Sequence, residues 1–266
     1  MSLKIVVLAK QVPDTRNVGK DAMTAEGTVN RAALPAIFNP EDLNALEQAL
    51  RIKEQNPGTT VGLLTMGPPR AGEIIREGLY RGADTGWLLT DRLFAGADTL
   101  ATSYALATAI KKIGDVDLVI GGRQAIDGDT AQVGPQVAEK LEIPQVTYAE
   151  EMLAVDENAI TIRRRLERGT ECVKAALPVL VTVTSAGEDC RFPNAHRLLR
   201  QAKDEVRMIN ADCIDADMDR LGLKGSPTKV KKIENVVLAH KESVVLEPTE
   251  AALNELSATL IKEHIL

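Results

Sequence analysis

Four short apolar runs recur in the first half of the chain, and longer amphipathic stretches separate them. The runs are KIVVLA at 4–9, TTVGLLTM at 59–66, TGWLLT at 85–90 and VDLVIG at 116–121. Each is largely continuous and does not alternate between apolar and polar residues, which is typical of strands buried on both faces of a parallel sheet. The pattern therefore predicts four parallel strands.

The stretches between these runs carry the start and stop signals of helices. Residues 40–55, 68–83 and 97–114 begin near Pro, Asp or Thr and end in basic residues or glycine. Strands that alternate with helices predict an α/β fold built from repeated βαβ units. In such open sheets ligands bind beyond the carboxyl ends of the strands, where the strand order reverses.

A polar, glycine-rich turn, GGRQAIDGDTAQVG at 121–134, follows the fourth run and precedes another helical stretch. Its glycines allow the backbone to come close to a ligand, and Thr130 is predicted to be the N-cap of the helix. The N–H groups and positive dipole of that helix would point into the turn, which suits a phosphate. An ordinary surface turn before a well-capped helix explains the same residues.

Three other loops are expected at the same edge of the sheet: Ala9 with Lys10, NPED at 39–42, and MGPPR at 66–70. Lys10 or Arg123 could supply positive charge to a phosphate. Asn39 or Gln124 could bind an adenine edge or a ribose. The convergence of four such loops favours a nucleotide site over isolated surface turns.

Composition excludes several other functions. A formal net charge of -6 gives no general attraction to nucleic acid, and an aromatic content of 3% offers few side chains for stacking bases. The three cysteines, at 172, 190 and 213, match neither a disulfide framework nor a zinc site, which is typical of a reducing cytosol. No apolar run approaches the ~20 residues of a membrane span. We therefore expect a soluble, cytoplasmic protein that binds neither nucleic acid nor membrane.

Common catalytic motifs are missing from the sequence. There is no GxxxxGK[ST] loop, no GxGxxG after the first run, and no GxSxG or HExxH, while the histidines at 196, 240 and 264 are far apart. We expect no catalytic side chain and no metal site. Binding without a protein-borne acid, base or nucleophile indicates that a cofactor carries the reactive chemistry.

The second half of the chain has a different pattern of apolar and polar residues. Residues 150–187 alternate, with turns at 156–158 and 168–169 and an apolar run after Pro178, which predicts antiparallel strands that close the domain. Residues 194–209 predict a helix followed by a short strand.

The C-terminal part is less able to fold alone. Residues 210–240 have weak periodicity and would bury little surface unless they packed on another subunit, and residues 247–266 predict a helix with Leu253, Leu256, Leu260 and Ile261 on one side. We expect an α/β nucleotide-binding domain at 1–209 and a C-terminal arm and helix at 210–266.

Six segments spread over nearly the whole chain carry a family resemblance: VVLAKQVPDT, NPEDLNALEQALRIKE, TMGPP, RGAD, GRQAIDGDTAQVGPQVAEKLEIPQVTY and TVTSAGEDCRFP. They resemble the beta subunit of electron-transfer flavoprotein. The resemblance implies a Rossmann-like parallel sheet of the adenine-nucleotide-binding type, with antiparallel additions and a C-terminal arm that embraces an alpha subunit. It also implies that the turn at 121–134 wraps the phosphate and adenosine part of a nucleotide.

The resemblance leaves two nucleotides open. Ordinary members hold a structural AMP and carry one FAD, bound mainly by the alpha subunit, whereas electron-bifurcating members hold a second FAD in the beta subunit. The segment DRLFAGADTLATSYALA at 91–107 is similar to the FAGADT segment of the bifurcating group. There Gly96 would allow close approach to a flavin, Asp98 or Thr99 would cap a helix that faces it, and Thr102 and Ser103 would donate hydrogen bonds. A capped helix after a loop is the alternative.

The bifurcating resemblance implies an NADH-oxidising electron-transport heterodimer. NADH would give a hydride to the beta-subunit FAD, one electron would pass to ferredoxin or flavodoxin, and the other would pass through the alpha-subunit FAD to an acyl-CoA dehydrogenase or related enoyl-CoA reductase. The alternative is a non-bifurcating beta subunit with AMP. A third reading, a nucleotide-binding sensor without redox work, is disfavoured by the tail.

The residues implied to bind the cofactor are Ala9, Lys10, Asn39, Asp42, Met66, Phe94, Gly96, Thr99, Thr102, Gly122, Arg123, Gln124, Gly128, Thr130, Ala131, Gln132, Val133 and Gly134. Relatives that feed acyl-CoA dehydrogenases present an apolar docking residue, commonly leucine, where the loop CRFPNAHRLL has Ala195 or His196. The basic run at 163–165 faces the alpha subunit or FAD, or is a solvated face.

Overall fold

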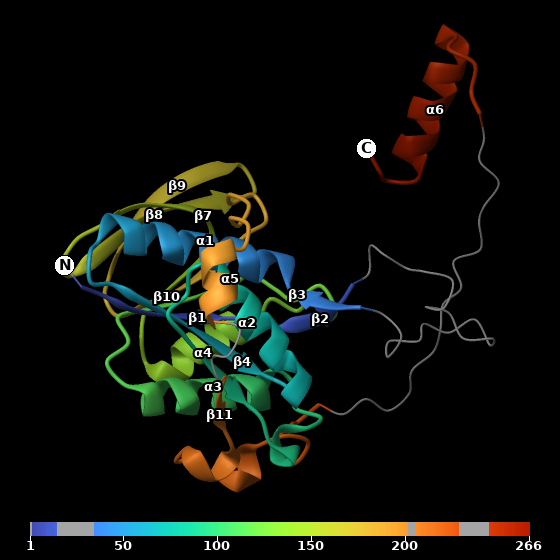
Figure 1. Cartoon of the computed structure of the whole chain (residues 1–266). Helices are drawn as coiled ribbons and strands as arrows, with labels where there is room; N and C mark the ends of the chain where they lie inside the picture. The colour runs from blue at the N-terminus through green and yellow to red at the C-terminus, as the bar shows by residue number, and fades with distance from the viewer. Residues whose placement is uncertain (1, 15–34, 202–205, 229–244) are drawn as a thin grey trace.

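The computed structural model describes residues 2–14, 35–201, 206–228 and 245–266 (Figure 1). Residues 229–244 of the expected C-terminal arm lie outside these ranges. The chain forms an α/β body around one large sheet, as the sequence predicts.

Within the described ranges, nine strands form the large sheet in the order β11-β5-β4-β1-β6-β10-β7-β8-β9. The four predicted parallel strands are β1 (Lys4–Leu8), β4 (Thr60–Met66), β5 (Thr85–Leu89) and β6 (Leu118–Gly122). The others are β7 (Gln145–Val155), β8 (Ala159–Leu166), β9 (Gly169–Ala176), β10 (Val179–Val183) and β11 (Arg207–Ile209). A separate antiparallel ribbon consists of β2 (Gln11–Pro13) and β3 (Ala36–Phe38).

The helices alternate with the strands as expected. They are α1 (Pro40–Gln55), α2 (Gly72–Arg81), α3 (Thr99–Ile113), α4 (Val133–Leu141), α5 (Ala195–Gln201) and α6 (Glu250–Lys262). Short 3-10 turns are η2 (Pro69–Ala71), η3 (Arg92–Phe94), η4 (Ala211–Cys213) and η5 (Met218–Arg220). No helix among these is long and apolar enough to cross a lipid bilayer.

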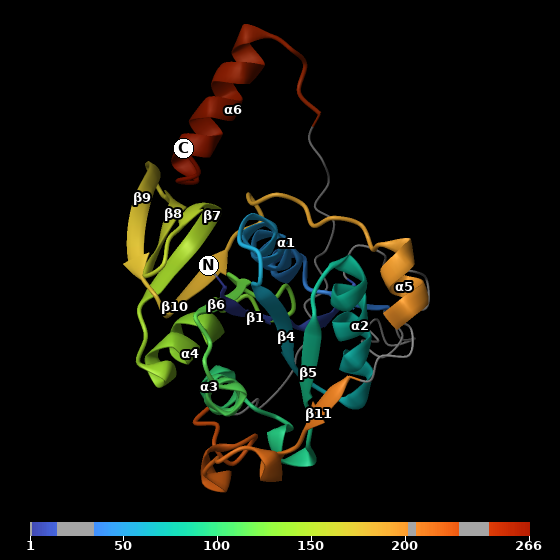
Figure 2. The same cartoon turned by 60° about the vertical axis from the view of Figure 1, so that its left-hand side comes forward.

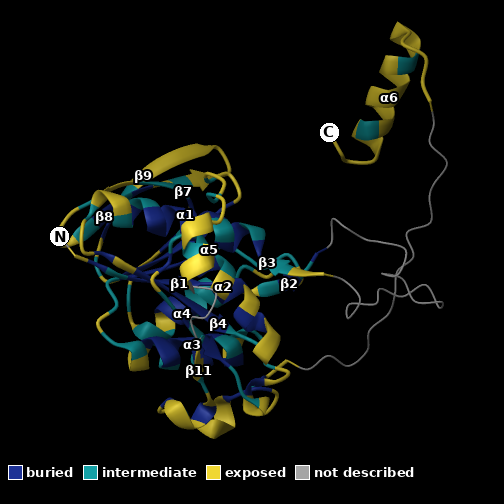
Figure 3. Cartoon of the chain, in the orientation of Figure 1, coloured by how far each residue is buried: buried dark blue, intermediate teal, exposed yellow. Residues whose placement is uncertain are grey.

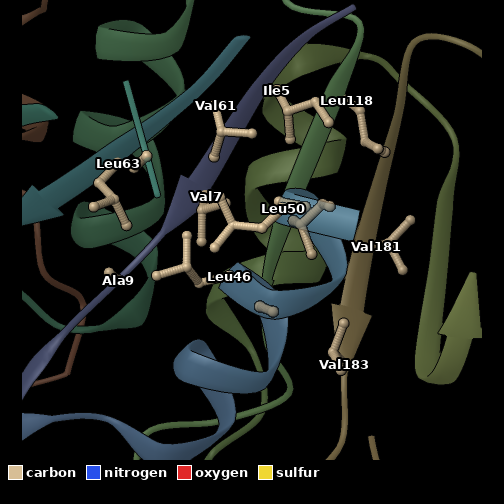
Figure 4. Close-up of a cluster of buried hydrophobic side chains, with 14 of the residues drawn as sticks. Ile5, Val7, Ala9, Leu46, Leu50, Val61, Leu63, Leu118, Val181 and Val183 are labelled. Atoms are coloured by element: carbon tan, nitrogen blue, oxygen red, sulfur yellow. The ribbon is translucent and has the colours of Figure 1, made fainter. Parts of the chain in front are cut away.

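The central strand β1 explains why its run is continuously apolar. Ile5 and Val7 pack under α1 with Leu46 and Leu50 (Figure 4), while Val6 joins the cluster on the opposite face with α3 and α4. Both faces of the sheet are therefore covered by helices, and the four apolar residues of the strand, Ile5 to Leu8, are all buried.

Strand β10 corrects one expectation. The apolar run after Pro178 was predicted to be antiparallel, but β10 pairs in parallel with both β6 and β7. All five of its residues are buried, which is the burial expected of a central strand and not of an edge hairpin. The predicted turns at 156–158 and 168–169 do join antiparallel strands, β7 to β8 and β8 to β9.

The C-terminal part is only partly attached to the body. The predicted helix and strand are α5 and β11, and after them Ala211, Ile214 and Leu221 are buried in the same cluster as α3. Residues 210–228 thus bury more surface than their weak periodicity suggests. The predicted C-terminal helix is α6, none of whose residues is buried, and it stands apart from the body in both views (Figures 2 and 3).

Candidate functional site

The strand order reverses at β1. The chain runs from β1 to β4 and β5 on one side and then returns to β6 on the other side of β1. The loops that leave β1 and β6 therefore diverge at the carboxyl edge, which is where open parallel sheets bind ligands. This arrangement brings the predicted residues Ala9 and Lys10 next to Gly122 and Arg123, and their role in binding stays a prediction.

The side chain of Asp42 joins these two strand ends. Its Oδ2 accepts a hydrogen bond from the Lys10 N–H at 2.8 Å, and its Oδ1 accepts one from the Gly122 N–H at 2.9 Å. A Cβ at position 122 would lie 2.4 Å from that Oδ1, so only glycine fits there. Burial raises the pKa of Asp42 to about 7, because it outweighs the hydrogen bonds that lower it.

Two further residues at the start of α1 hold the turn after β6. The buried Asn39 amide donates to the Gln124 carbonyl at 2.9 Å and accepts from the Ile126 N–H at 3.2 Å. Glu41 accepts from the Gln124 N–H at 2.9 Å and pairs with Arg123 at 3.2 Å. Asn39 therefore shapes the loop with both ends of its amide, and its role in binding an adenine stays a prediction. The sequence did not single out Glu41.

The two candidate cations are partly neutralised by carboxylates. Lys10 Nζ lies 2.7 Å from Asp127 Oδ1, and the Arg123 guanidinium lies 5.8 Å from the ring centroid of Tyr148. Arg123 Nε is buried and has no hydrogen-bond partner in the described part of the chain. An unpaired guanidinium donor at this edge of the sheet suits an anionic ligand.

The turn at 121–134 enters its helix later than predicted. The N-cap position of α4 is Gln132 and not Thr130, since Asp129 and Ala131 have φ of 48° and 53° and keep the backbone out of the helix. Gly134 lies in the first turn of α4, where a Cβ would meet Thr182 at 2.5 Å.

Because α4 begins late, several backbone N–H groups before and at its start have no acceptor in the described part of the chain. Among the described residues, the N–H groups of 130–134 donate to no protein atom. A Cβ at Gly128 would meet nothing within 4 Å, so the turn is open. Unpaired N–H groups at the start of a helix suit a phosphate. The residues of the turn therefore fit the phosphate part of a nucleotide.

The segment before α3 reaches the same turn. Asp98 is the N-cap of α3, as expected, and its carboxylate accepts from the Ala101 N–H at 3.0 Å. The Thr99 hydroxyl donates to Gln132 Oε1 at 3.0 Å. The start of α3 and the turn before α4 are thus joined side chain to side chain, which the sequence alone did not reveal.

The other predicted residues near α3 differ in exposure. Gly96 has φ of 71°, a conformation that favours glycine, and Thr102 and Met66 are half-buried. Phe94 is 5% exposed, so any contact with a ligand would be through its backbone. Ser103 is fully buried and its hydroxyl is used by Leu100 and Gln136, so it is not a donor to a ligand.

The basic run at 163–165 is neutralised within the antiparallel strands. Arg163 pairs with Glu151 at 2.7 Å and Arg165 with Glu150 at 2.6 Å, while Arg164 lies 3.5 Å from Glu171. The run is therefore a paired strand surface.

The loop that precedes α5 presents an exposed residue that the sequence pattern did not single out. Ala195 opens α5 and is exposed together with His196, but the large exposed side chain is Phe192, at 90%. Beside it lies a cavity of about 570 Å³ lined partly by Arg81, Arg191 and Phe192. The signal was available, because an aromatic residue in a polar loop is unusual in a chain with so few aromatics.

Comparison with known proteins gives consistent matches. A model of the electron transfer flavoprotein domain matches residues 26–206. The electron transfer flavoprotein subunit beta of Clostridium acetobutylicum is 46% identical over 264 residues, which cover 99% of this chain and 100% of that protein. The caffeyl-CoA reductase-Etf complex subunit CarD of Acetobacterium woodii is 48% identical over 228 residues, 86% of each chain. Protein FixA of Sinorhizobium fredii is 42% identical over 268 residues, which cover 97% of this chain and 92% of that protein.

Proposed function

The chain belongs to the electron transfer flavoprotein family as a beta subunit, and from this premise we propose that it is of the electron-bifurcating, NADH-oxidising type. It would then bind an FAD of its own beside an alpha subunit that holds another. The observation that carries the proposal is the hydrogen bond between Thr99 and Gln132, since it joins the FAGADT segment to the turn at 121–134. The likeness to CarD, a subunit of a caffeyl-CoA reductase-Etf complex, supports it.

The proposed cofactor site uses residues from both segments. The N–H groups of 130–134 would hold the phosphates, with Arg123 and Lys10 adding positive charge. Asn39, Glu41 and Asp42 hold the loops of the site in place. When bound, FAD supplies the chemistry, hydride acceptance from NADH and onward one-electron transfer to ferredoxin or flavodoxin and to the alpha-subunit FAD.

The protein's own contribution lies in electrostatics and backbone shape. The N-terminus of α3 carries a partial positive charge that favours an electron-rich ring nearby, and Asp98 fixes where that helix begins. The positive φ at Gly96 lets the backbone turn just before the helix. The proposal requires no side-chain nucleophile.

The exposed apolar side chains indicate where the proposed partners would bind. As a beta subunit the chain pairs with an alpha subunit, and the exposed apolar side chains of α6, Leu253 and Ile261 among them, suit a helix that packs on that subunit. We propose that 1–209 is the nucleotide-binding domain and 210–266 the arm, with 210–228 as its root on the body. An acyl-CoA dehydrogenase-type partner would bind through Phe192.

The alternative is a beta subunit that holds AMP in the same turn and leaves all redox work to the alpha subunit. Co-production with the alpha subunit, followed by denaturing release and counting of nucleotides, separates the two. Two FAD and no AMP per heterodimer support the bifurcating type, and reduction of the second flavin by NADH is then expected. One FAD with one AMP rejects it.

A further inference from the structure

Residues 222–228 pack directly against the residues that lead into α3. The Leu223 N–H donates to the Ala95 carbonyl at 3.0 Å. Gly222 has φ of 50°, and a Cβ there would lie 2.1 Å from the Leu93 carbonyl oxygen. Only glycine permits an approach this close, so the two backbones are in contact although they are distant in sequence.

Asp98 is the centre of this contact. While its Oδ1 caps α3, its Oδ2 accepts from both the N–H and the hydroxyl of Thr228, at 3.1 and 2.7 Å. The Asp98 N–H donates to the buried Ser226 hydroxyl at 2.8 Å. Partial burial raises the pKa of Asp98, but the hydrogen bonds from Ala101 and Thr228 outweigh it and hold the pKa below its usual value.

The apolar packing around this contact is incomplete. A cavity of about 390 Å³ lies between the first turns of α3 and residues 219–227, with Leu100 and Tyr104 among its lining. Arg220 spans part of the gap, with its guanidinium 3.9 Å from the ring centroid of Tyr104. Because the space is not filled by side chains, the hydrogen bonds at Asp98 have a larger share in fixing residues 94–99.

We propose that Ser226 and Thr228 are positioning residues for the segment 94–99, so that the root of the C-terminal arm and the segment before α3 hold one conformation together. The inference rests on the proposed function, which gives the arm and this segment their roles. If Thr228 moves away, Asp98 loses the donors on its second oxygen, and its hydrogen bond to the Ala101 N–H is held less firmly. The segment 94–99 then loses its fixed position relative to Gln132 and the phosphate turn.

Hydrogen–deuterium exchange on the heterodimer, co-produced with its alpha subunit, tests the link. Thr228→Val removes the hydroxyl at nearly constant volume, and exchange of the Asp98 and Ala101 N–H groups should speed up about tenfold or more, as for the loss of a hydrogen bond to a charged group. Thr228→Ser retains a hydroxyl and should restore slow exchange. Ser226→Ala should likewise speed exchange of the Asp98 N–H.

Thr108→Val is the matched control, because the Thr108 hydroxyl bonds to the Tyr104 carbonyl at 2.8 Å on the same helix, away from the contact. It should leave exchange at 98 and 101 unchanged. Unchanged exchange in both Thr228→Val and Ser226→Ala, or an equal increase in Thr108→Val, would overturn the proposal.

A second readout is the absorption spectrum of the beta-site flavin, which should change in Thr228→Val and return in Thr228→Ser. An unchanged flavin spectrum in Thr228→Val would also count against the positioning role. A count of one FAD and one AMP would reject the proposed function but would leave the exchange comparison intact, so the two failures are distinguishable.

Discussion

Glu47 of α1 and Arg191 of the loop before α5 form a multiple ion pair. Glu47 accepts from the Arg191 N–H at 3.0 Å and from its Nε and Nη2 at 2.9 and 2.8 Å. Burial raises the pKa of Glu47, but the hydrogen bonds and charge of Arg191 outweigh it and lower the pKa below 4.5. The pair fixes the loop that exposes Phe192.

Replacing Glu47 by Gln should lower the free energy of unfolding by about 2–3 kcal/mol, because the partly buried guanidinium loses its charged acceptor. Because the folded pKa of Glu47 is depressed, its contribution is present above pH 4.5 and is lost as the pH falls through the folded pKa. Urea unfolding at several pH values measures both effects. Glu54→Gln is the control, since that carboxylate bonds the same arginine but is 60% exposed, and its loss should cost less than about 1 kcal/mol.

Asp42→Asn should change how stability depends on pH. The folded pKa of Asp42 is about 7 against an ordinary value of 3.8, so the wild type is most stabilised by this group below pH 3.8 and loses that contribution as the pH rises to 7. The variant lacks this titration. The unfolding free energy of the wild type minus that of the variant should therefore fall between pH 4 and 7, on the order of 1.4 kcal/mol for each pKa unit. A flat difference would contradict the burial of the charged group.

Gly122→Ala should abolish tight nucleotide binding and destabilise the protein by about 1–3 kcal/mol. The added methyl would lie 2.4 Å from Asp42 Oδ1 and 2.8 Å from the Glu41 backbone, so the strand end must move. Gly128→Ala is the control, because its methyl would meet no protein atom within 4 Å, and its melting temperature should match the wild type. Equal melting temperatures for both variants would show that the strand end can move away from the added methyl group without a loss of stability.

Phe192→Ala should leave the stability of the protein unchanged because the side chain is 90% exposed. If it anchors an acyl-CoA dehydrogenase-type partner, its loss should raise the KM for that partner about tenfold or more with little change in kcat. Leu166→Ala, at an exposed position of the antiparallel strands, should not change the KM. Identical KM values for the wild type and Phe192→Ala would place the docking surface elsewhere.

Much of the fold could be predicted because its signals are local. The IVVL run of β1, the Asp98 cap of α3 and the turn at 168–169 each depend on a few neighbouring residues. The parallel pairing of β10 depends on β6 and β7, which lie far away in sequence, so its run was assigned to the wrong kind of strand. Thr130 fits the N-cap pattern but is not the cap, because the left-handed backbone at Asp129 and Ala131 leaves no clear mark in a sequence.

The site was predictable as a set of loops but not as a set of contacts. The strand-end positions of Ala9, Lys10 and Arg123 follow from the βαβ order. The burial of Glu41 and Glu47 does not, because acidic residues are expected to be solvated, and their partners come from loops about 80 and 144 positions away. Only the folded chain shows that they organise loops at both ends of α1.

Helix α1 binds two separate loops, the turn at 121–134 and the loop that carries Phe192. Asn39, Glu41 and Asp42 bind the turn at 121–134 near the start of the helix, and Glu47 and Glu54 bind the Phe192 loop further along its 16 residues, a span of about 24 Å. Ala45 and Ala49 are fully buried beneath the helix. A larger side chain at either position would shift the helix and so displace both sets of hydrogen bonds at once. Substitutions in the two surfaces should therefore show epistasis although no atom of one touches the other.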